Sequence, residues 1–303
     1  MNYREMFLVK PGTKVNLAKI DPDFTAGFKN EKSAKNKIKK YNKSMTELQN
    51  SLFAEGKWSV LICLQGLDAA GKTGTISHVL GSMDPQGTRV CGFRVPTAEE
   101  AAHDFLWRIE KQVPAKGEVV IFNRSQYEDV LVVRVHNLVP EARWSKRYDF
   151  INNYERQLGA NNTHIIKFFL HISPGEQLKR YRERLDDPAK QWKITEADYK
   201  ERDFWKQYMA AYEDALSKTS TENAPWYVIP SNNKWFRDLA VSKIVVEELE
   251  SLGIKIPKPQ VDVDEIRRKY HEAKSEEAEG KEPHVEKGPE WPRTHKASIN
   301  KKL

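Results

Sequence analysis

The stretch that decides the fold reads Ser59-Val60-Leu61-Ile62-Cys63-Leu64-Gln65-Gly66-Leu67-Asp68-Ala69-Ala70-Gly71-Lys72-Thr73-Gly74. The residues before Gly66 are mostly apolar, which predicts a strand buried on both faces. The strand leads into the pattern Gly66-x-x-x-x-Gly71-Lys72-Thr73 and then into a segment that can be helical. This order of strand, glycine loop and helix is the context that a phosphate-binding loop requires. An ordinary glycine turn is the alternative. The strand before the loop and the helical segment after it favour the phosphate site.

The residues of this loop suit phosphate chemistry. Glycines let backbone N–H groups close around phosphate oxygens, and the positive end of the next helix dipole points to the same place. Lys72 supplies a compact positive charge, and the Thr73 hydroxyl can ligate Mg²⁺. The sequence therefore predicts a phosphate site formed by Gly66, Ala69, Ala70, Gly71, Lys72, Thr73 and Gly74.

Asp68 is unusual in such a loop, because its carboxylate repels the phosphates that the loop should bind. One interpretation is an exposed aspartate of a turn. The other is that Asp68 holds a metal ion that also touches a second phosphate group. The second interpretation predicts a site where two phosphorylated molecules meet.

The composition indicates polyanionic partners. The chain has 303 residues, of which 39% are hydrophobic and 31% charged, and its net charge is +7. A basic chain suits nucleotides, nucleic acid, other phosphate chains or acidic lipid. Two cysteines, Cys63 and Cys91, lie in apolar runs and are expected to be buried, reduced thiols. With no membrane-spanning run and no signal-peptide core, we expect a cytoplasmic protein.

Strands alternating with helices predict an α/β fold: a five-stranded parallel sheet flanked by helices. A lysine-rich helix is expected over residues 31–55 and a last core helix over about 235–252. The expected domains are an extended N-terminal arm over 1–30, a P-loop kinase domain over 31–257 and a charged, partly disordered tail over 258–303. Within the tail we expect a frayed helix near 263–280 and then disorder. The predicted strands are 59–65, 89–96, 118–122, 165–172 and 226–230.

The third predicted strand ends at Asn123, where a P-loop enzyme usually carries an aspartate for Mg²⁺. An amide can bind phosphate or a metal-bound water but brings no charge, so metal binding falls more heavily on Asp68. Glu128 and Asp129, from the following turn, are expected to help Asp68 hold the metal, and Glu128 also to contribute to phosphate or nucleotide binding. We expect Arg124 to clamp phosphate. For Glu128 and Asp129, acids that complement a helix dipole are the alternative.

A helical lid is predicted over about residues 174–218. Arg180 and Arg184 lie four residues apart and share a helix face. The helix starts at the carboxyl end of a strand, the ligand side of a parallel sheet. Arginines there can hold oxygens that gain charge during phosphate transfer. A salt-bridged surface helix is the alternative. We expect Arg182 and Lys193 to contribute to phosphate or nucleotide binding.

Six segments of the chain, in order, resemble the polyphosphate kinase 2 family. They are Gly66–Gly74, Val95-Pro96-Thr97 with His103–Arg108, Phe122–Asp129, Lys190–Lys193, Tyr208–Asp214 and Ala224–Pro230. The resemblance covers about residues 30–252. It implies a fold like that of thymidylate kinase, with a P-loop parallel sheet and a helical lid.

The resemblance also implies an activity: transfer of phosphate between inorganic polyphosphate and nucleotides, with Mg²⁺ as cofactor and Mn²⁺ as a substitute. Asp68, Lys72, Arg124, Arg180 and Arg184 would then be catalytic, with Asp68 and Thr73 as metal ligands. Many members have aspartate at the position of Asn123. The combination of Asn123 and Glu128 resembles the subgroup that phosphorylates both mono- and diphosphates, here AMP and ADP or GMP and GDP. A homo-oligomer, dimer or tetramer, is expected.

Three alternatives remain at this stage. An ATP-dependent nucleoside monophosphate kinase could use the same scaffold. A basic nucleic-acid-binding module would fit the charge, but no motif of such a module is present. A non-catalytic nucleotide sensor would lack turnover. We expect polyphosphate and nucleotides as partners, and neither nucleic acid nor a membrane.

Overall fold

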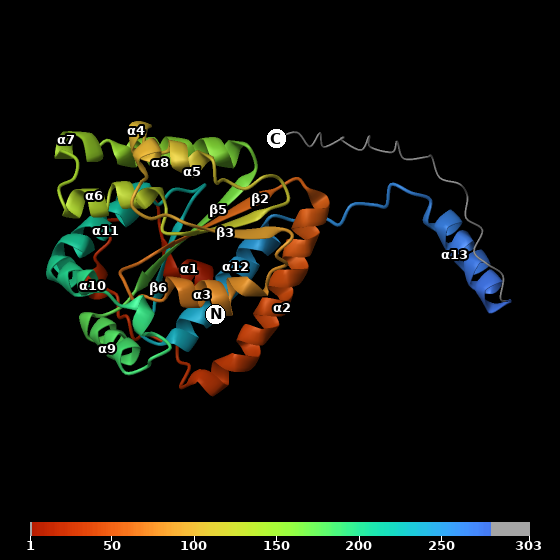
Figure 1. The fold of residues 1–303 in the computed structure, drawn as a ribbon, viewed down its shortest axis with the longest axis horizontal. Helices are drawn as coiled ribbons and strands as arrows, with labels where there is room; N and C mark the ends of the chain where they lie inside the picture. Colours follow the sequence, from red (N-terminus) through yellow and green to blue (C-terminus); the bar gives the residue numbers. More distant parts are fainter. Residues whose placement is uncertain (1, 280–303) are drawn as a thin grey trace, which may run out of the picture. The chain divides into compact units, whose positions relative to one another are not determined.

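The computed structural model describes residues 2–279 (Figure 1). The chain divides into two compact units, Met1–Ile256 and Pro257–Leu303. Within the described part of the second unit there is one helix, α13 (Val263–Ala278), close to the predicted helix at 263–280. The predicted disorder of residues 280–303 lies outside the described residues. Between residues 2 and 279, no helix is both long and apolar enough to cross a bilayer.

The first unit is built on a six-stranded sheet in the order β1-β6-β5-β2-β4-β3. Every neighbouring pair is parallel except β1 and β6, which are antiparallel. The predicted number of five strands is wrong, because Leu8 and Val9 add an edge strand beside Tyr227 and Trp226. The strands are β1 (Leu8–Val9), β2 (Ser59–Gln65), β3 (Thr88–Gly92), β4 (Val119–Asn123), β5 (Thr163–His171) and β6 (Trp226–Pro230).

Strand β2 shows why the sheet needs helices on both faces. All seven of its residues are buried, and its successive side chains enter different cores. Val60, Ile62 and Leu64 pack with α2 (Glu31–Glu55) and α12 (Lys234–Ser251). Leu61 and Cys63 face the opposite core. Burial of apolar groups on both faces explains the continuous apolar run in the sequence.

The helices form one layer on each side of the sheet. On the side of α2 and α12, which lie next to each other in Figure 1, are α1 (Tyr3–Phe7) and α3 (Lys72–His78). The other layer contains α5 (Trp107–Glu110), α6 (Val132–Val135), α7 (Glu141–Trp144), α8 (Arg147–Ala160) and α11 (Trp205–Thr219). The remaining helices are η1 (Leu17–Lys19), η2 (Leu80–Ser82), α4 (Ala98–Ala102), η3 (Gln126–Asp129), α9 (Pro174–Leu185), η4 (Gln191–Lys193), α10 (Glu196–Glu201) and η5 (Arg202–Phe204).

The first 30 residues are more structured than an extended arm. Besides β1 they form α1 and η1, and Tyr3, Phe7 and Leu17 are buried. Tyr3 and Phe7 pack against Phe236 of α12. The first 30 residues therefore contribute to the hydrophobic core, and β1 pairs with the outer edge of β6.

Candidate active site

The loop between β2 and α3 has the conformation that its glycines predict. Gly66 and Gly71 have φ values of 152° and 110°. A side chain at position 71 would also collide with the guanidinium of Arg237. Ala69 adopts φ 62°, a left-handed conformation that costs about 1–3 kcal/mol for a residue with a side chain. Such strain persists where the surrounding structure fixes the backbone.

Lys72 is the first residue of α3, and its ammonium lies inside the loop. Its Nζ donates to the carbonyl oxygens of Gly66 at 2.6 Å and Leu67 at 3.2 Å. Burial disfavours the charged form and lowers the pKa of Lys72 to about 8, although Asp68 opposes the shift.

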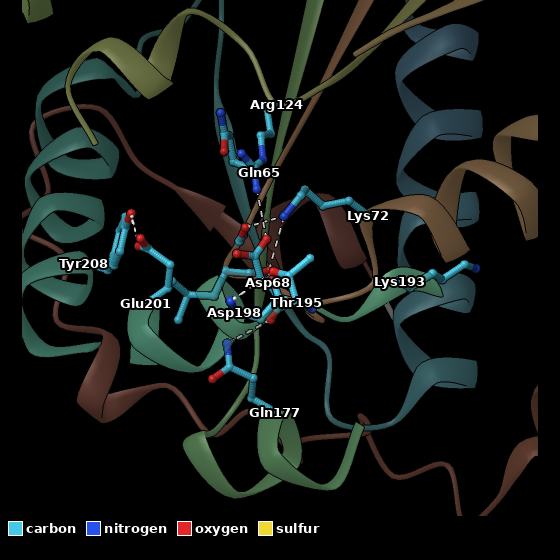
Figure 2. A network of polar contacts seen from close by, with 12 residues as sticks. Gln65, Asp68, Lys72, Arg124, Gln177, Lys193, Thr195, Asp198, Glu201 and Tyr208 are labelled. Carbon is cyan, nitrogen blue, oxygen red and sulfur yellow. Dashed lines mark hydrogen bonds and ion pairs between the residues drawn. The ribbon is translucent and has the colours of Figure 1, made fainter. Parts of the chain in front are cut away.

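Asp68 and Arg124 form an ion pair across the site. The Nη2 atom of Arg124 lies 2.9 Å from Oδ1 of Asp68, and both side chains keep some exposure. Burial alone would raise the pKa of Asp68, but the charges of Lys72 and Arg124 outweigh it and lower the pKa. Figure 2 shows Lys72 and Arg124 converging on Asp68. The carboxylate is therefore ionised and available at neutral pH.

The end of β4 supplies the next group of residues. Asn123 is the last residue of β4, and Arg124 follows it with φ 66°. The Arg124 amide donates to the carbonyl oxygen of Leu64 at 3.1 Å, which fixes this turn beside β2. Glu128 lies further back in η3, where burial raises its pKa against the opposing charges of Arg124 and Lys72. Asp129 is paired with Arg147 and Arg108 and is therefore committed to the fold.

A cleft of about 440 Å³ opens over the loop. Eleven residues that the sequence singled out line it: Asp68, Ala69, Gly71, Lys72, Thr73, Gly74, Asn123, Arg124, Arg180, Arg184 and Lys193. Gly66, Ala70, Glu128 and Arg182 do not line it.

Arg182 is the clearest departure from the predicted site. Its side chain is 84% exposed and pairs with Asp186 one turn along α9. The alternative of a salt-bridged surface helix describes this position. Arg184, on the cleft side, donates to the carbonyl oxygen of Lys193 at 3.3 Å and links α9 to η4.

Arg180 is buried at the base of the cleft, with 4% of its surface exposed. Its nitrogen atoms donate to Glu176 and to four backbone carbonyl oxygens, those of Ala69, Ala70, Ser231 and Asn232. Protein groups therefore occupy the donors that sequence interpretation assigned to phosphate.

Five further residues line the cleft: His78, Glu183, Lys190, Lys234 and Arg237. Lys234 and Arg237 come from the first turn of α12, directly after β6. The rule that ligands bind at the carboxyl ends of parallel strands could have indicated both. The buried contact of Arg237 with Gly71 and Gly74 is long-range, and no local pattern reveals it.

The charge of the cleft defines its chemistry. Eight of its lining side chains are basic and two, Asp68 and Glu183, are acidic. Such a surface attracts a ligand with several negative charges. Asp68 and Thr73 offer a carboxylate and a hydroxyl, which suit a divalent cation that takes its other ligands from substrate phosphates. Within residues 2–279 there is no group of three or more His, Cys, Asp or Glu residues that could hold a metal by itself.

Comparison with known proteins identifies the family. The profile of Polyphosphate kinase 2 matches residues 28–256. The chain belongs to the polyphosphate kinase 2 family. The resemblance noted in the sequence is therefore confirmed, and the match ends where the first compact unit ends.

Members of the polyphosphate kinase 2 family resemble the chain over most of its length. An AMP/ADP-polyphosphate phosphotransferase of Meiothermus ruber is 49% identical over 261 residues, which cover 86% of this chain and 98% of the relative. An ADP-polyphosphate phosphotransferase of Rhodopseudomonas palustris is 42% identical, over 84% of this chain and 92% of the relative. The crystal structure of Polyphosphate Kinase 2 from Arthrobacter aurescens TC1 superposes with a TM-score of 0.86 at 45% identity. That match covers 90% of this chain and 97% of the other.

Membership of the polyphosphate kinase 2 family confirms a P-loop kinase-like α/β fold, with six strands in this chain. It also makes the chain a phosphotransferase, a class of enzyme that works with a divalent metal ion. The closer likeness to thymidylate kinase stays a prediction, as do the roles of the individual site residues.

Proposed function

We propose that the chain transfers the terminal phosphate of inorganic polyphosphate to AMP and ADP, and to GMP and GDP. The polymer loses one phosphate unit, and the nucleotide gains it as ADP or ATP, or as GDP or GTP. The observation that carries this proposal is the cleft itself. Eight basic side chains and a P-loop surround the ionised carboxylate of Asp68.

A donor that has neither base nor sugar can be bound through its charges alone. Lysine and arginine side chains that line the cleft supply such binding, and they come from α9, η4 and α12. The relatives from Meiothermus ruber and Rhodopseudomonas palustris carry polyphosphate and AMP/ADP or ADP in their names, which supports the same substrates here.

Catalysis in this site consists of positioning and charge neutralisation. The terminal phosphate of the acceptor is largely ionised at pH 7, so no strong general base is needed. Lys72 and the loop amides hold the transferring group, while Arg124 and Arg184 stabilise the charge that develops on its oxygens. Asn123 and Glu128 support the use of both mono- and diphosphates, because the family subgroup with that combination has this breadth.

Asp68 and Thr73 would hold Mg²⁺, with Mn²⁺ as a substitute. The bound ion would neutralise phosphate charge between donor and acceptor. Holding the ion requires the Asp68 carboxylate to share its charge between the metal and Arg124, which lies 2.9 Å away. A carboxylate has enough lone pairs to coordinate a metal ion and also to accept the hydrogen bond from Arg124.

A cytoplasmic homo-oligomer, dimer or tetramer, completes the proposal. Two free cysteines, with Cys63 buried and Cys91 half-buried, suit a reducing compartment, and the nucleotide substrates are intracellular.

The decisive experiment mixes purified protein, Mg²⁺ and polyphosphate with AMP, ADP, GMP or GDP, in parallel and without ATP. We expect formation of the next higher phosphate in each case and none when EDTA replaces Mg²⁺. An ATP-dependent nucleoside monophosphate kinase would need ATP in place of polyphosphate. Folded protein that makes no product from polyphosphate with any divalent metal would refute the proposal.

A further inference from the structure

Arg180 has a complete set of protein partners. A guanidinium carries five N–H groups. In Arg180 the Nε atom lies 2.8 Å from Oε1 of Glu176, and Nη1 lies 2.8 and 2.9 Å from the carbonyl oxygens of Ala69 and Ala70. Nη2 donates to the carbonyl oxygens of Ser231 and Asn232. Five donors therefore meet five acceptors, and none is left for a ligand.

Gln177 makes a matching contact one turn earlier in α9. Its Nε2 donates to the carbonyl oxygen of Asp68 at 2.9 Å, and its Oε1 accepts from Arg202 at 2.7 Å. Gln177 is 3% exposed. Figure 2 shows it approaching Asp68 from the side opposite to Lys72 and Arg124. Three successive loop carbonyls, of residues 68, 69 and 70, are thus held by one face of α9.

The orientation of these carbonyls decides where the loop amides point. In a trans peptide the C=O of one residue and the N–H of the next point in opposite directions. Among residues 2–279 no cis peptide occurs. Carbonyls held toward α9 therefore turn the amides of Ala69 and Gly71 away from α9. The amide of Ala70 is already used, since it donates to Leu67 at 3.0 Å.

We propose that Arg180 is a positioning residue, which together with Gln177 fixes the peptide orientation of the P-loop before substrate binds. It acts as a strut between α9, the loop and the β6–α12 connection, and it does not contact phosphate. The strut also explains how Ala69 keeps its left-handed conformation. This inference rests on the proposed phosphate role of the loop.

The kinetic test compares Arg180→Lys with Arg180→Gln. Lysine keeps the charge but cannot reach four carbonyls in the geometry of a guanidinium. We expect both variants to lose roughly tenfold or more in kcat, which corresponds to about 1.4 kcal/mol of activation free energy. The slope of log kcat/KM against log salt for polyphosphate should stay that of the parent, because no phosphate contact is lost.

Arg184→Gln is the comparison, because Arg184 lines the cleft and donates to one carbonyl oxygen among the described residues, that of Lys193. We expect Arg184→Gln to make the slope of log kcat/KM against log salt less steep, because a phosphate contact is lost. If Arg180→Lys restored most of the activity that Arg180→Gln loses, and if Arg180→Gln flattened the slope as Arg184→Gln does, Arg180 would be a phosphate ligand and the inference would be overturned.

Hydrogen exchange gives a readout that does not depend on turnover. In the absence of substrate, both Arg180 variants should exchange the amides of residues 66–74 at least tenfold faster, while those of β5 keep their protection. Arg156→Gln, an exposed arginine of α8, is the matched control and should change neither. Unchanged exchange in the loop would overturn the inference.

A milder variant covers the case in which the Arg180 variants do not fold. Gln177→Ala removes one carbonyl contact and should accelerate exchange of the same loop in the same direction. Its failure to do so would also overturn the inference. If the parent protein had no polyphosphate activity, the proposed function would be refuted. The hydrogen-exchange result would still test whether Arg180 and Gln177 hold the loop in place.

Discussion

At the scale of single residues, Lys72 couples the site to pH. Its ordinary pKa of 10.5 falls to about 8 in the folded protein, because burial disfavours the ammonium. Above pH 8, Lys72 of the free enzyme therefore loses the positive charge that, in the proposed function, binds phosphate. We expect kcat/KM to decline above about pH 8, since that parameter reports on the free enzyme.

The decline in kcat should come at higher pH, because bound phosphate favours the charged lysine. Initial rates between pH 6 and 10, at low and at saturating polyphosphate, would separate the two parameters. A kcat/KM that stays flat up to pH 10 would contradict the shifted pKa.

Asp68 gives a second prediction at this scale. Asp68→Asn keeps the shape of the side chain but removes the charge that would hold a metal ion and that pairs with Arg124. We expect kcat to fall by roughly a hundredfold or more, or about 2.7 kcal/mol. The melting temperature should stay close to that of the parent, because an ion pair that remains partly exposed contributes little to stability.

Asp203→Asn, which changes an exposed aspartate of η5, is the control and should leave turnover unchanged. Near-normal turnover of the Asp68→Asn variant would show that Asp68 is not a catalytic residue.

Much of the site could be predicted from single residues, and the exceptions share one cause. The loop, Asn123 and Arg124 follow directly from strand ends, and the structure brings them together with Arg184 and Lys193. The distinction between Arg180 and Arg184 depends on which of two similar arginines meets backbone carbonyls. The spacing along one helix cannot specify this, because the acceptors lie on the P-loop and after β6.

At the scale of elements, a buried network supports the turn after β4. Lys167 of β5 and Glu155 of α8 form an ion pair at 2.6 Å and are almost completely buried. Glu155 also accepts from Tyr127 and Gln126, the two residues directly before Glu128 in η3. Breaking one partner of a buried pair leaves an uncompensated charge. We expect Lys167→Met to lower the free energy of unfolding by about 3–5 kcal/mol.

Urea denaturation measures this loss, and a double-mutant cycle tests its origin. Lys167→Met combined with Glu155→Gln should cost less than the sum of the single changes, because neither charge then stays alone. Lys43→Met, which removes an exposed pair with Glu47, should change the free energy of unfolding by under about 0.5 kcal/mol. Additive effects of the buried changes would contradict the pairing.

The same scale shows what sequence patterns miss. Strands β2, β4, β5 and β6 are buried and apolar, so local hydrophobicity revealed them. Strand β1 has two residues, and only its antiparallel pairing with β6, more than 200 residues away, makes it a strand. A pairing of that kind leaves no periodicity along the chain.

At the scale of the whole molecule, the division into two compact units predicts that the chain can be truncated at their boundary with little effect on activity. Every residue that lines the cleft lies in Met1–Ile256, and the family profile also ends at residue 256. We expect a protein that ends after Ile256 to keep kcat within about twofold of the full chain, because it keeps its own hydrophobic core. Steady-state kinetics and thermal unfolding of both proteins would check this. A large loss of kcat in a folded, truncated protein would show that the second unit takes part in catalysis.

Strand β2 carries the P-loop, and it is hydrogen-bonded to β5 along its whole length and to β4 along most of it. The end of the P-loop that follows β2 therefore stays fixed for as long as β2 remains hydrogen-bonded within the sheet. Heating should abolish turnover and melt the sheet at the same temperature, provided that α9 holds the free side of the loop. If the enzyme loses activity below that temperature while its sheet is still intact, we expect that the segment from α9 to α11 has become disordered first.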